Sequence, residues 1–352
     1  MNKKNNSITV GMIAAVFLIA VLYFWPKGLV TADSGQCLVM GTFARVVSVA
    51  ADSSIAGKCI DAAFEQINTV ESLMSIHRDD SEISRVNGDG FNRAVKVSKP
   101  TYEVLQKAIE FSRRTEGAFD ITIGPLAELW QSAAEANSVP TQAEIQQVSK
   151  RVGFRKITLD DDQMSVRFAV EGMKLDLGGI AKGYAIDRTI DAMRKCGAVG
   201  AMVDIGGDIK CFGSPPKGRK KWLIGLQDPA KVKDDIAPDQ LLLRLKLTNQ
   251  AIATSGDYRR FVLIKGNKYS HIIDVKKGSS SNQLSSVTII ADSAIDADAL
   301  ATAVSVMGAE KGLALIESMP QTEAILIPAS AGMTSQPQYK LIKSSGAGEY
   351  IE

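Results

Sequence analysis

The sequence predicts an α+β fold in which a mixed, largely antiparallel sheet packs against helices, preceded by one N-terminal transmembrane segment. Three observations predict it. Many short strand-like runs are joined by gaps of hairpin length, only a few segments show helical periodicity, and an uncharged apolar run precedes them all. A doubly wound fold would instead alternate strands and helices along the chain.

The apolar run covers residues 8–25 and contains no charged side chain. At a rise of 1.5 Å per residue, a helix of this length nearly crosses a hydrocarbon core of about 30 Å. Lys3 and Lys4 precede the run, so we expect a cytoplasmic N-terminus and export of everything after Pro26. The alternative is a signal peptide cleaved near Val30-Thr31-Ala32. We therefore expect an inner-membrane protein with its catalytic domain in the periplasm, or a secreted periplasmic protein if the segment is cleaved.

The chain divides into four parts. Residues 1–26 form the anchor or signal segment, 27–38 a linker, 39–330 the catalytic domain, and 331–352 a C-terminal tail, whose polar residues 344–349 we expect to be mobile.

Composition excludes some classes of function. The 41 basic and 39 acidic residues leave a formal charge of +2, without the basic excess of a nucleic-acid-binding protein. One basic cluster, residues 217–221, follows two prolines; it favours a solvated loop, with contact to a partner or to lipid as the alternative. The four cysteines lack Cys-x-x-Cys spacing, and we expect mostly buried free thiols.

Periodicity places the helices and strands in order. In residues 58–74, Ile60, Phe64 and Ile67 share one helical face, and residues 182–196 end at Gly197, a common helix stop. The other predicted helices follow Pro100 to about Gly117, or cover 137–153 and 296–318. Strands are predicted at 43–50, 156–160, 164–170, 172–177, 199–205, 222–227, 241–247, 250–254, 260–265, 269–274, 285–291 and 323–327.

The first candidate site is the turn that runs from Asp176 through Gly178-Gly179 to a helix beginning near Lys182. Glycines let backbone N–H groups approach phosphate oxygens, and a helix N-terminus adds a positive dipole. The pattern therefore predicts a dinucleotide pyrophosphate here, although Gly-Gly before a helix is often only a tight connection.

Asp298 and Thr302 form the second candidate, because their i, i+4 spacing projects both oxygens from one helical face. A carboxylate, a hydroxyl and a backbone carbonyl from a glycine turn suit a Mg²⁺ ion that keeps several waters and bridges phosphates. The alternative is an exposed acid in an early turn and a packed threonine.

The chain has only two histidines, His77 and His271, so it cannot build a three-histidine zinc site. His77 follows a helix, and His271 lies on an expected strand ending at Asp274. A structural role is the default for either. Polar turns at 117–120, 206–208 and 253–257 suggest backbone near a flat ligand, although each alone is only a turn.

Taken together, these segments resemble the ApbE family of flavin transferases, also called FAD:protein FMN transferases. The markers occur in family order from about Met40 to about Ile327. They are Met40-Gly-Thr42, Met74-Ser75 with Asp80-Ser-Glu-Ile-Ser-Arg-Val-Asn87, Gly117-Ala-Phe-Asp120, Gly124-Pro-Leu126 with Trp130, Asp176-Leu-Gly-Gly-Ile-Ala-Lys-Gly183, Gly206-Gly-Asp208, Thr254-Ser-Gly-Asp257, His271-Ile-Ile-Asp274 and Asp298-Ala-Leu-Ala-Thr302.

The resemblance implies an enzyme that binds FAD and Mg²⁺ and passes FMN to a threonine or serine of an acceptor protein, releasing AMP. The implied FAD contacts are Met40, His77, Ala118, Phe119, Asp120, Asp176, Lys182 and Ile272. The implied Mg²⁺ ligands are the carbonyl of Gly179 with Asp298 and Thr302. We expect His271 to be the general base, with Asp257 or Asp274 as a substitute base or an orienting carboxylate.

The chain departs from the family pattern at two places. His77 stands where tyrosine is usual, so stacking on the flavin would be smaller. Val275 and Lys277 replace the usual proline and threonine, which could alter acceptor choice. The expected acceptors carry a Ser/Thr-Gly-Ala-Thr-type motif, as in subunits of sodium-pumping NADH:quinone reductase or its Rnf relatives. The alternatives are Mg²⁺-dependent hydrolysis of FAD to FMN and AMP, or a non-catalytic periplasmic FAD-binding protein.

Overall fold

A nine-stranded sheet forms the centre of the protein in the computed structural model, which describes residues 28–229, 241–256, 261–329 and 341–352. The strand order is β1-β3-β7-β8-β11-β16-β17-β18, and β2 also pairs with β3. The strands are β1 (Val30–Asp33), β2 (Cys37–Val39), β3 (Thr42–Ala50), β7 (Gly200–Ile205), β8 (Asp208–Gly213), β11 (Ala251–Gly256), β16 (Leu284–Ala291), β17 (Glu323–Pro328) and β18 (Ile342–Lys343). Within the described ranges every strand pair is antiparallel, which confirms the α+β class and makes the sheet antiparallel rather than mixed.

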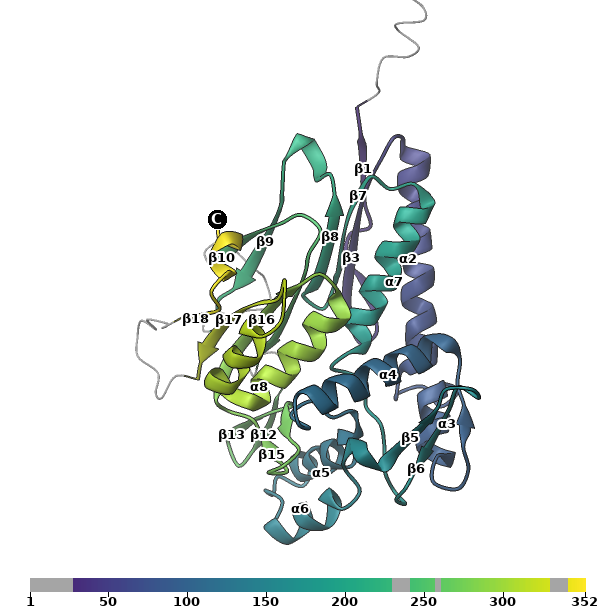
Figure 1. Ribbon diagram of the computed structural model, residues 1–352, viewed down its shortest axis with the longest axis vertical. Coiled ribbons are helices and arrows are strands. Elements are labelled where there is room, and N and C mark those ends of the chain that lie inside the picture. The colour runs from purple at the N-terminus through teal and green to yellow at the C-terminus, as the bar shows by residue number, and fades with distance from the viewer. Residues whose placement is uncertain (1–27, 230–240, 257–260, 330–340) are drawn as a thin grey trace, which may run out of the picture.

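Three long helices cover one face of this sheet: α2 (Ser53–Met74), α7 (Ala181–Cys196) and α8 (Ala294–Glu317) (Figure 1). Their apolar faces and the facing strand residues form the largest buried core. Asp52 begins α2 by accepting the Ile55 N–H at 2.9 Å, and α7 ends at Gly197 with a φ of 103°. The helices predicted at 58–74 and 182–196 are thus confirmed, with α2 beginning earlier.

The last helix, α8, is interrupted, whereas we expected a continuous one over 296–318. Gly308 has a φ of 78° inside α8, and a Cβ at this position would collide with the side chain of Gln283. Only glycine adopts this conformation readily at such a close approach. Among the described helices α8 alone is long and apolar enough to cross a membrane, but it is packed in the core of this domain.

The opposite face of the sheet is covered by the two-stranded ribbon of β9 (Trp222–Gln227) and β10 (Leu241–Leu247). The C-terminal residues 341–352 complete this layer, so the expectation of a mobile tail at residues 344–349 is wrong. Ala347 is fully buried, β18 pairs with β17, and Leu245 forms a β-bridge with Ile351.

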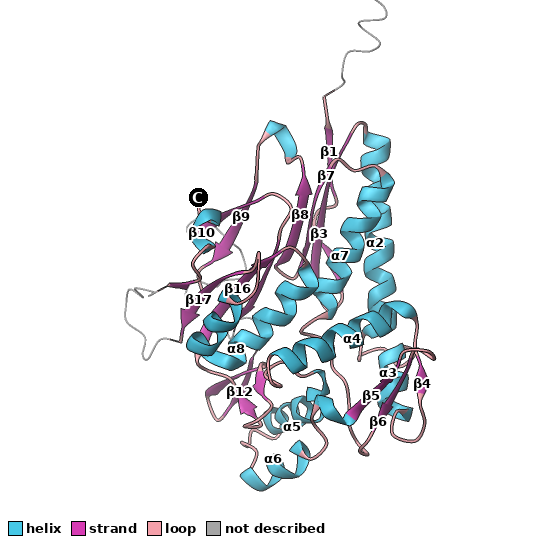
Figure 2. Cartoon of the chain, in the orientation of Figure 1, coloured by secondary structure: helices cyan, strands magenta, loops and turns pink. Residues whose placement is uncertain are grey.

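A smaller layer lies beyond the end of the sheet, where Figure 2 shows short helices and strands. It contains β4 (Val95–Lys96), β5 (Ile157–Asp160), β6 (Ser165–Phe168), α3 (Glu82–Asp89), α4 (Lys99–Arg114), α5 (Gly124–Glu135) and α6 (Gln142–Ser149). Two hairpins, β12 (Phe261–Ile264) with β13 (Asn267–Ser270) and β14 (Ile273–Asp274) with β15 (Ser279–Ser280), pack on α5 and α6. The Trp130 indole N–H of α5 donates to the carbonyl of Gly278 at 2.9 Å and so joins this helix to the β14–β15 hairpin.

Three sequence predictions fail here. Residues 172–177 form no strand, because the Asn87 side chain takes both backbone groups of Leu175, at 2.7 and 3.0 Å. The helix expected over 137–153 covers only Gln142–Ser149, because Thr141 and Glu144 form a capping box that starts it late. The strand expected at 269–274 is split between β13 and β14 by His271 and Ile272. The apolar run at 8–25 lies outside the described residues.

All four cysteines, which the described ranges include, are free. Cys59 and Cys211 are buried, and Cys37 and Cys196 are half-buried. The sequence predicts mostly buried free thiols, and two of the four are buried.

Candidate active site

A lysine and two aspartates meet where α7 and α8 begin. Lys182 lies in the first turn of α7, Asp208 at the start of β8, and Asp298 in the second turn of α8. The Lys182 ammonium donates to the Asp208 carboxylate and, at 3.1 Å, to Asp298 Oδ1. The Gly183 N–H donates to Asp298 Oδ2 at 3.0 Å. Three segments far apart in the sequence therefore build one charged cluster.

The two helices can start side by side because α7 presents a glycine to α8. A Cβ on Gly183 would lie 2.6 Å from the carbonyl carbon of Ala294, too close for any other residue. Asp187, one turn further along α7, accepts the N–H groups of Ala294 and Ile295 at 3.0 and 2.9 Å. Since these N–H groups have no partner within α8, a side chain of α7 caps that helix and fixes Asp298 beside Lys182.

Burial and mutual charge set the protonation of the cluster. Burial raises the pKa of Asp298 to about 6, and the Asp208 charge acts in the same direction, whereas Lys182 opposes both. Burial alone would lower the pKa of Lys182, but the carboxylates of Asp208 and Asp298 raise it above its ordinary value. The lysine therefore stays a cation throughout the physiological range.

The residues expected to hold magnesium are brought together. A Cβ on Gly179 would lie 3.0 Å from the Thr302 hydroxyl oxygen, and Thr302 is one helical turn after Asp298. The Thr302 hydroxyl makes no hydrogen bond with any described residue. Carboxylate, hydroxyl and carbonyl oxygens are the donors a hard cation takes, so this set fits one Mg²⁺ ion. Over the same described ranges, no group of three or more His, Cys, Asp or Glu side chains could hold a metal.

The glycine turn differs in one respect from its sequence interpretation. The segment before it is not a strand: the Asp176 N–H donates to the Ile121 carbonyl at 2.8 Å, and the Asp176 carboxylate accepts the Gly178 N–H at 2.8 Å. The start of α7 already donates to a carboxylate of the protein through Gly183. The Gly183 N–H at the start of α7 is thus taken by Asp298, and the Lys182 ammonium is the positive charge beside it.

Met40 lies next to the Asp208 turn. It occupies the β2–β3 turn with a φ of 47°, and Gly41 follows with a φ of 67°. The neighbouring Gly206 N–H donates to the Phe43 carbonyl at 2.9 Å, and a Cβ on Gly206 would lie 3.0 Å from the Thr42 hydroxyl. The structure therefore places Met40 at the same end of the sheet as Asp208.

Residues 118–120 lie against the glycine turn, but their side chains are used differently from one another. Phe119 is buried, and its ring lies 3.3 Å from a Cβ placed on Gly179. The Asp120 carboxylate is buried and accepts from Thr122 twice, at 2.8 and 2.6 Å, and from the Phe154 N–H at 2.9 Å. Burial raises the pKa of Asp120, although these bonds oppose it. Asp120 thus holds the loop that carries Ala118 and Phe119.

The His271 segment reaches α8 near Thr302. The Ser281 hydroxyl donates to the carbonyl of Ser305 at 2.6 Å, and the Ser281 N–H donates to the Ile272 carbonyl at 2.8 Å. His271 itself is exposed, and Ile272 is buried. The imidazole therefore stands on a short connection tied one turn of α8 away from Thr302.

Asp274, the substitute base, is committed to its own turn. It is buried, and its Oδ1 accepts the N–H groups of Lys276 and Lys277 at 3.0 and 3.3 Å. Its Oδ2 forms an ion pair with the Lys277 ammonium at 3.1 Å. These contacts favour a structural role for Asp274 in the β14–β15 hairpin over a role as a base.

The two remaining predicted residues are His77 and Asp257. His77 is exposed between α2 and α3. Its backbone N–H donates to the Ser75 hydroxyl at 3.3 Å, and its ring is accessible to a ligand. Asp257 lies outside the described residues.

Sequence reasoning did not name Asp208, Asp187 or Asn87 as positioning residues. Asp208 had a signal, because it follows a Gly-Gly pair in a polar turn between strands. Asp187 and Asn87 had none, since each acts on backbone groups distant in the chain.

A half-buried lysine between two buried carboxylates, beside a glycine turn that precedes a helix, is typical of a site for a phosphorylated ligand. Comparison with known proteins narrows this class. The model of the ApbE family matches residues 40–326, and this chain belongs to the ApbE family.

Curated relatives support the same conclusion. The FAD:protein FMN transferase of Vibrio cholerae is 36% identical over 275 residues, covering 76% of this chain and 78% of the relative. That of Klebsiella pneumoniae is 31% identical over 296 residues, covering 84% and 88%. Among solved structures, the ApbE protein of Thermotoga maritima has a TM-score of 0.78 at 30% identity, and the flavin transferase ApbE of Vibrio cholerae 0.76 at 30%. Each alignment covers 92% of this chain and 99% of the other.

Proposed function

We propose that this protein transfers the FMN part of FAD to a serine or threonine hydroxyl of an acceptor protein and releases AMP. The observation that carries the proposal is the Lys182, Asp208 and Asp298 cluster beside Gly179 and Thr302, in a chain whose relatives are named FAD:protein FMN transferases. In this reaction the acceptor oxygen forms a bond to the FMN phosphorus, and the phosphoanhydride bond to AMP breaks.

The residues divide the work. Lys182 would place a fixed cation beside the bound pyrophosphate. The Phe119 ring packs against Gly179 and so shapes the glycine turn. Gly179, Asp298 and Thr302 would hold Mg²⁺, which when bound offsets negative charge on the phosphates and on the leaving AMP. Positioning and charge stabilisation are the main requirements of phosphoryl transfer.

His271 would accept the proton of the acceptor hydroxyl. An imidazole is suited to this because its pKa lies near neutral pH. Its exposure fits the role, since the acceptor is a protein that must reach it from solvent. The hydrogen bond from Ser281 to Ser305 keeps this segment close to Thr302 on α8.

The acceptor and the location belong to the same proposal. We propose acceptors with a Ser/Thr-Gly-Ala-Thr-type motif in subunits of membrane redox pumps, such as the sodium-pumping NADH:quinone reductase or Rnf type. Residues 8–25 would anchor the enzyme in the inner membrane with the catalytic domain in the periplasm.

Incubation of the full chain with FAD, MgCl₂ and a purified acceptor domain tests the proposal. Covalent flavin fluorescence on the acceptor in a denaturing gel, lost when its motif threonine is replaced by valine and when EDTA is added, is the expected result. Free FMN and AMP without labelled acceptor would identify a hydrolase instead, and intact FAD would identify a binding protein.

A further inference from the structure

The loop between β8 and β9 carries an uncompensated positive charge. We call residues 214–221 the basic loop; its cations Lys217, Arg219, Lys220 and Lys221 are all exposed. In the described part of the chain, no carboxylate lies within ion-pair distance of these four side chains. Because the whole protein has a formal charge of only +2, this is a local concentration rather than a general excess.

The basic loop lies beside the place where the N-terminal segment joins the domain. Leu29 and Thr31 line one cavity of about 360 Å³ together with Pro215, Lys217 and Arg219. Figure 1 shows this arrangement: β1 and the β8–β9 connection reach the same upper end of the molecule. Only Pro26 and Lys27 separate the apolar run at 8–25 from the described chain.

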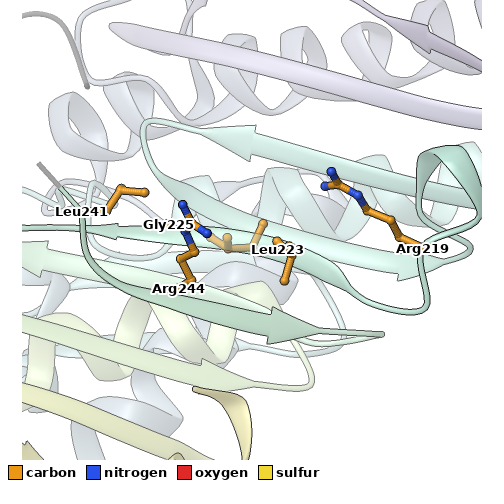
Figure 3. A pocket seen from close by; sticks show the side chains of 6 residues that line it. Arg219, Leu223, Gly225, Leu241 and Arg244 are labelled. Atoms are coloured by element: carbon orange, nitrogen blue, oxygen red, sulfur yellow. The ribbon is translucent and has the colours of Figure 1, made fainter. Parts of the chain in front are cut away.

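Apolar side chains are exposed at the same end. Leu29 is 53% exposed, Val199 43% and Leu223 40%. Val199 adjoins the basic loop, since its carbonyl accepts the Ser214 N–H at 3.1 Å. Leu223 borders a second cavity on the β9–β10 ribbon, with Arg219 at its end and Arg244 along it (Figure 3). Exposed cations interspersed with aliphatic side chains are typical of surfaces that rest on a membrane interface.

We propose that this end of the molecule, formed by the basic loop with Leu29 and Val199, docks on the anionic phospholipid headgroups of the membrane that the N-terminal segment enters. Lysine and arginine near such a surface are attracted to its negative potential within about a Debye length. The segment 8–25 would keep the loop within that distance. The proposal therefore rests on the proposed anchoring, although not on the flavin chemistry.

Docking in this orientation has a consequence for the reaction. Lys182 and Cys196 lie at opposite ends of α7, and fourteen residues of helix span about 21 Å. The basic loop is at the Cys196 end, and the charged cluster is at the Lys182 end. The active site would thus face away from the lipid, about 20 Å from the docked end.

Amide hydrogen exchange on the full chain reconstituted in vesicles tests this. One set of vesicles contains only phosphatidylcholine, and the other contains phosphatidylcholine with phosphatidylglycerol at a ratio of about 7:3, enough to give a substantial negative surface potential. We expect exchange of residues 213–223 to be several-fold slower in the anionic vesicles, and the difference to disappear in high salt.

The matched variants remove equal charge from the two ends of the molecule. The test variant combines Lys217→Gln, Arg219→Gln, Lys220→Gln and Lys221→Gln. The control combines Lys96→Gln, Arg113→Gln, Lys150→Gln and Lys265→Gln, all exposed and outside the basic loop. Only the test variant should lose the protection, and both should label a soluble acceptor domain as the parent does.

Equal exchange rates in the two kinds of vesicle would overturn the docking, and so would equal loss of protection in both variants. Protection that needs an added protein rather than anionic lipid would assign the surface to a partner and would also overturn it. Failure of flavin transfer in the parent would contradict the proposed function instead, so the two failures are distinguishable.

Discussion

The Lys182 cluster and the His271 segment serve the same proposed reaction but are built in opposite ways. The cluster is assembled by β8, α7 and α8, and its two carboxylates are almost fully buried. His271 is exposed on a connection between small hairpins. The difference teaches that, in the proposed reaction, the part that would bind the small charged ligand is fixed by the core, whereas the part that would meet the protein acceptor lies at the surface.

The strongest test of the buried side is Asp298→Asn, which keeps the volume but removes the charge. We expect the rate of flavin transfer to fall by about 10³-fold, because a charge at the site of bond cleavage is lost. Calorimetric titration should show that Mg²⁺ affinity falls as well. Glu310→Gln, an exposed acid on the same helix, is the control. Unchanged Mg²⁺ affinity would remove Asp298 from the metal site.

The second test separates the scaffold from ligand contact. Asp120→Ala leaves the buried N–H groups of Thr122 and Phe154 without their acceptor. We expect a loss of about 3 kcal/mol in the free energy of unfolding, measured by urea denaturation without FAD. Asp120→Asn, which keeps one acceptor oxygen, should lose less. If Asp120 serves only FAD, stability without ligand would not change.

On the exposed side, His271→Gln should lower kcat by about 10²-fold, since general base catalysis contributes at least that factor. The free energy of unfolding and the affinity for FAD should both stay near those of the parent, because the side chain is not buried. The pH profile of kcat should also flatten at its acidic limb. A parallel loss of stability would mean that the histidine is structural.

The smallest effect is expected for Asp274→Asn. The amide oxygen can still accept from Lys276 and Lys277, so we expect the free energy of unfolding to fall by about 1 kcal/mol or less and kcat to stay within about threefold of the parent. Steady-state kinetics and thermal denaturation check both values. A fall in kcat as large as that of His271→Gln would restore Asp274 as a base and remove the contrast between the two regions.

Much of the fold could be predicted from the sequence because its periodicities are strong. Helices α2 and α7 follow from aligned apolar residues and a glycine stop, and most sheet strands from alternation. Helix α3 was missed because its eight residues hold only two buried apolar positions. The strand expected at 172–177 failed because Asn87, distant in the chain, takes the hydrogen bonds of Leu175 that a strand partner would need.

The site shows the same division. The sequence by itself determined the residue types: a glycine turn followed by Lys182, and Asp298 four residues before Thr302, were identified as one constellation through their resemblance to the ApbE family. Only the tertiary structure decided that Asp208 closes the cluster, that Asp120 and Asp274 are used by the protein itself, and that the basic loop lies beside Leu29 and Thr31. The physical reason is that local patterns report which groups a chain can offer, whereas burial and long-range hydrogen bonds decide which of them remain available to a ligand.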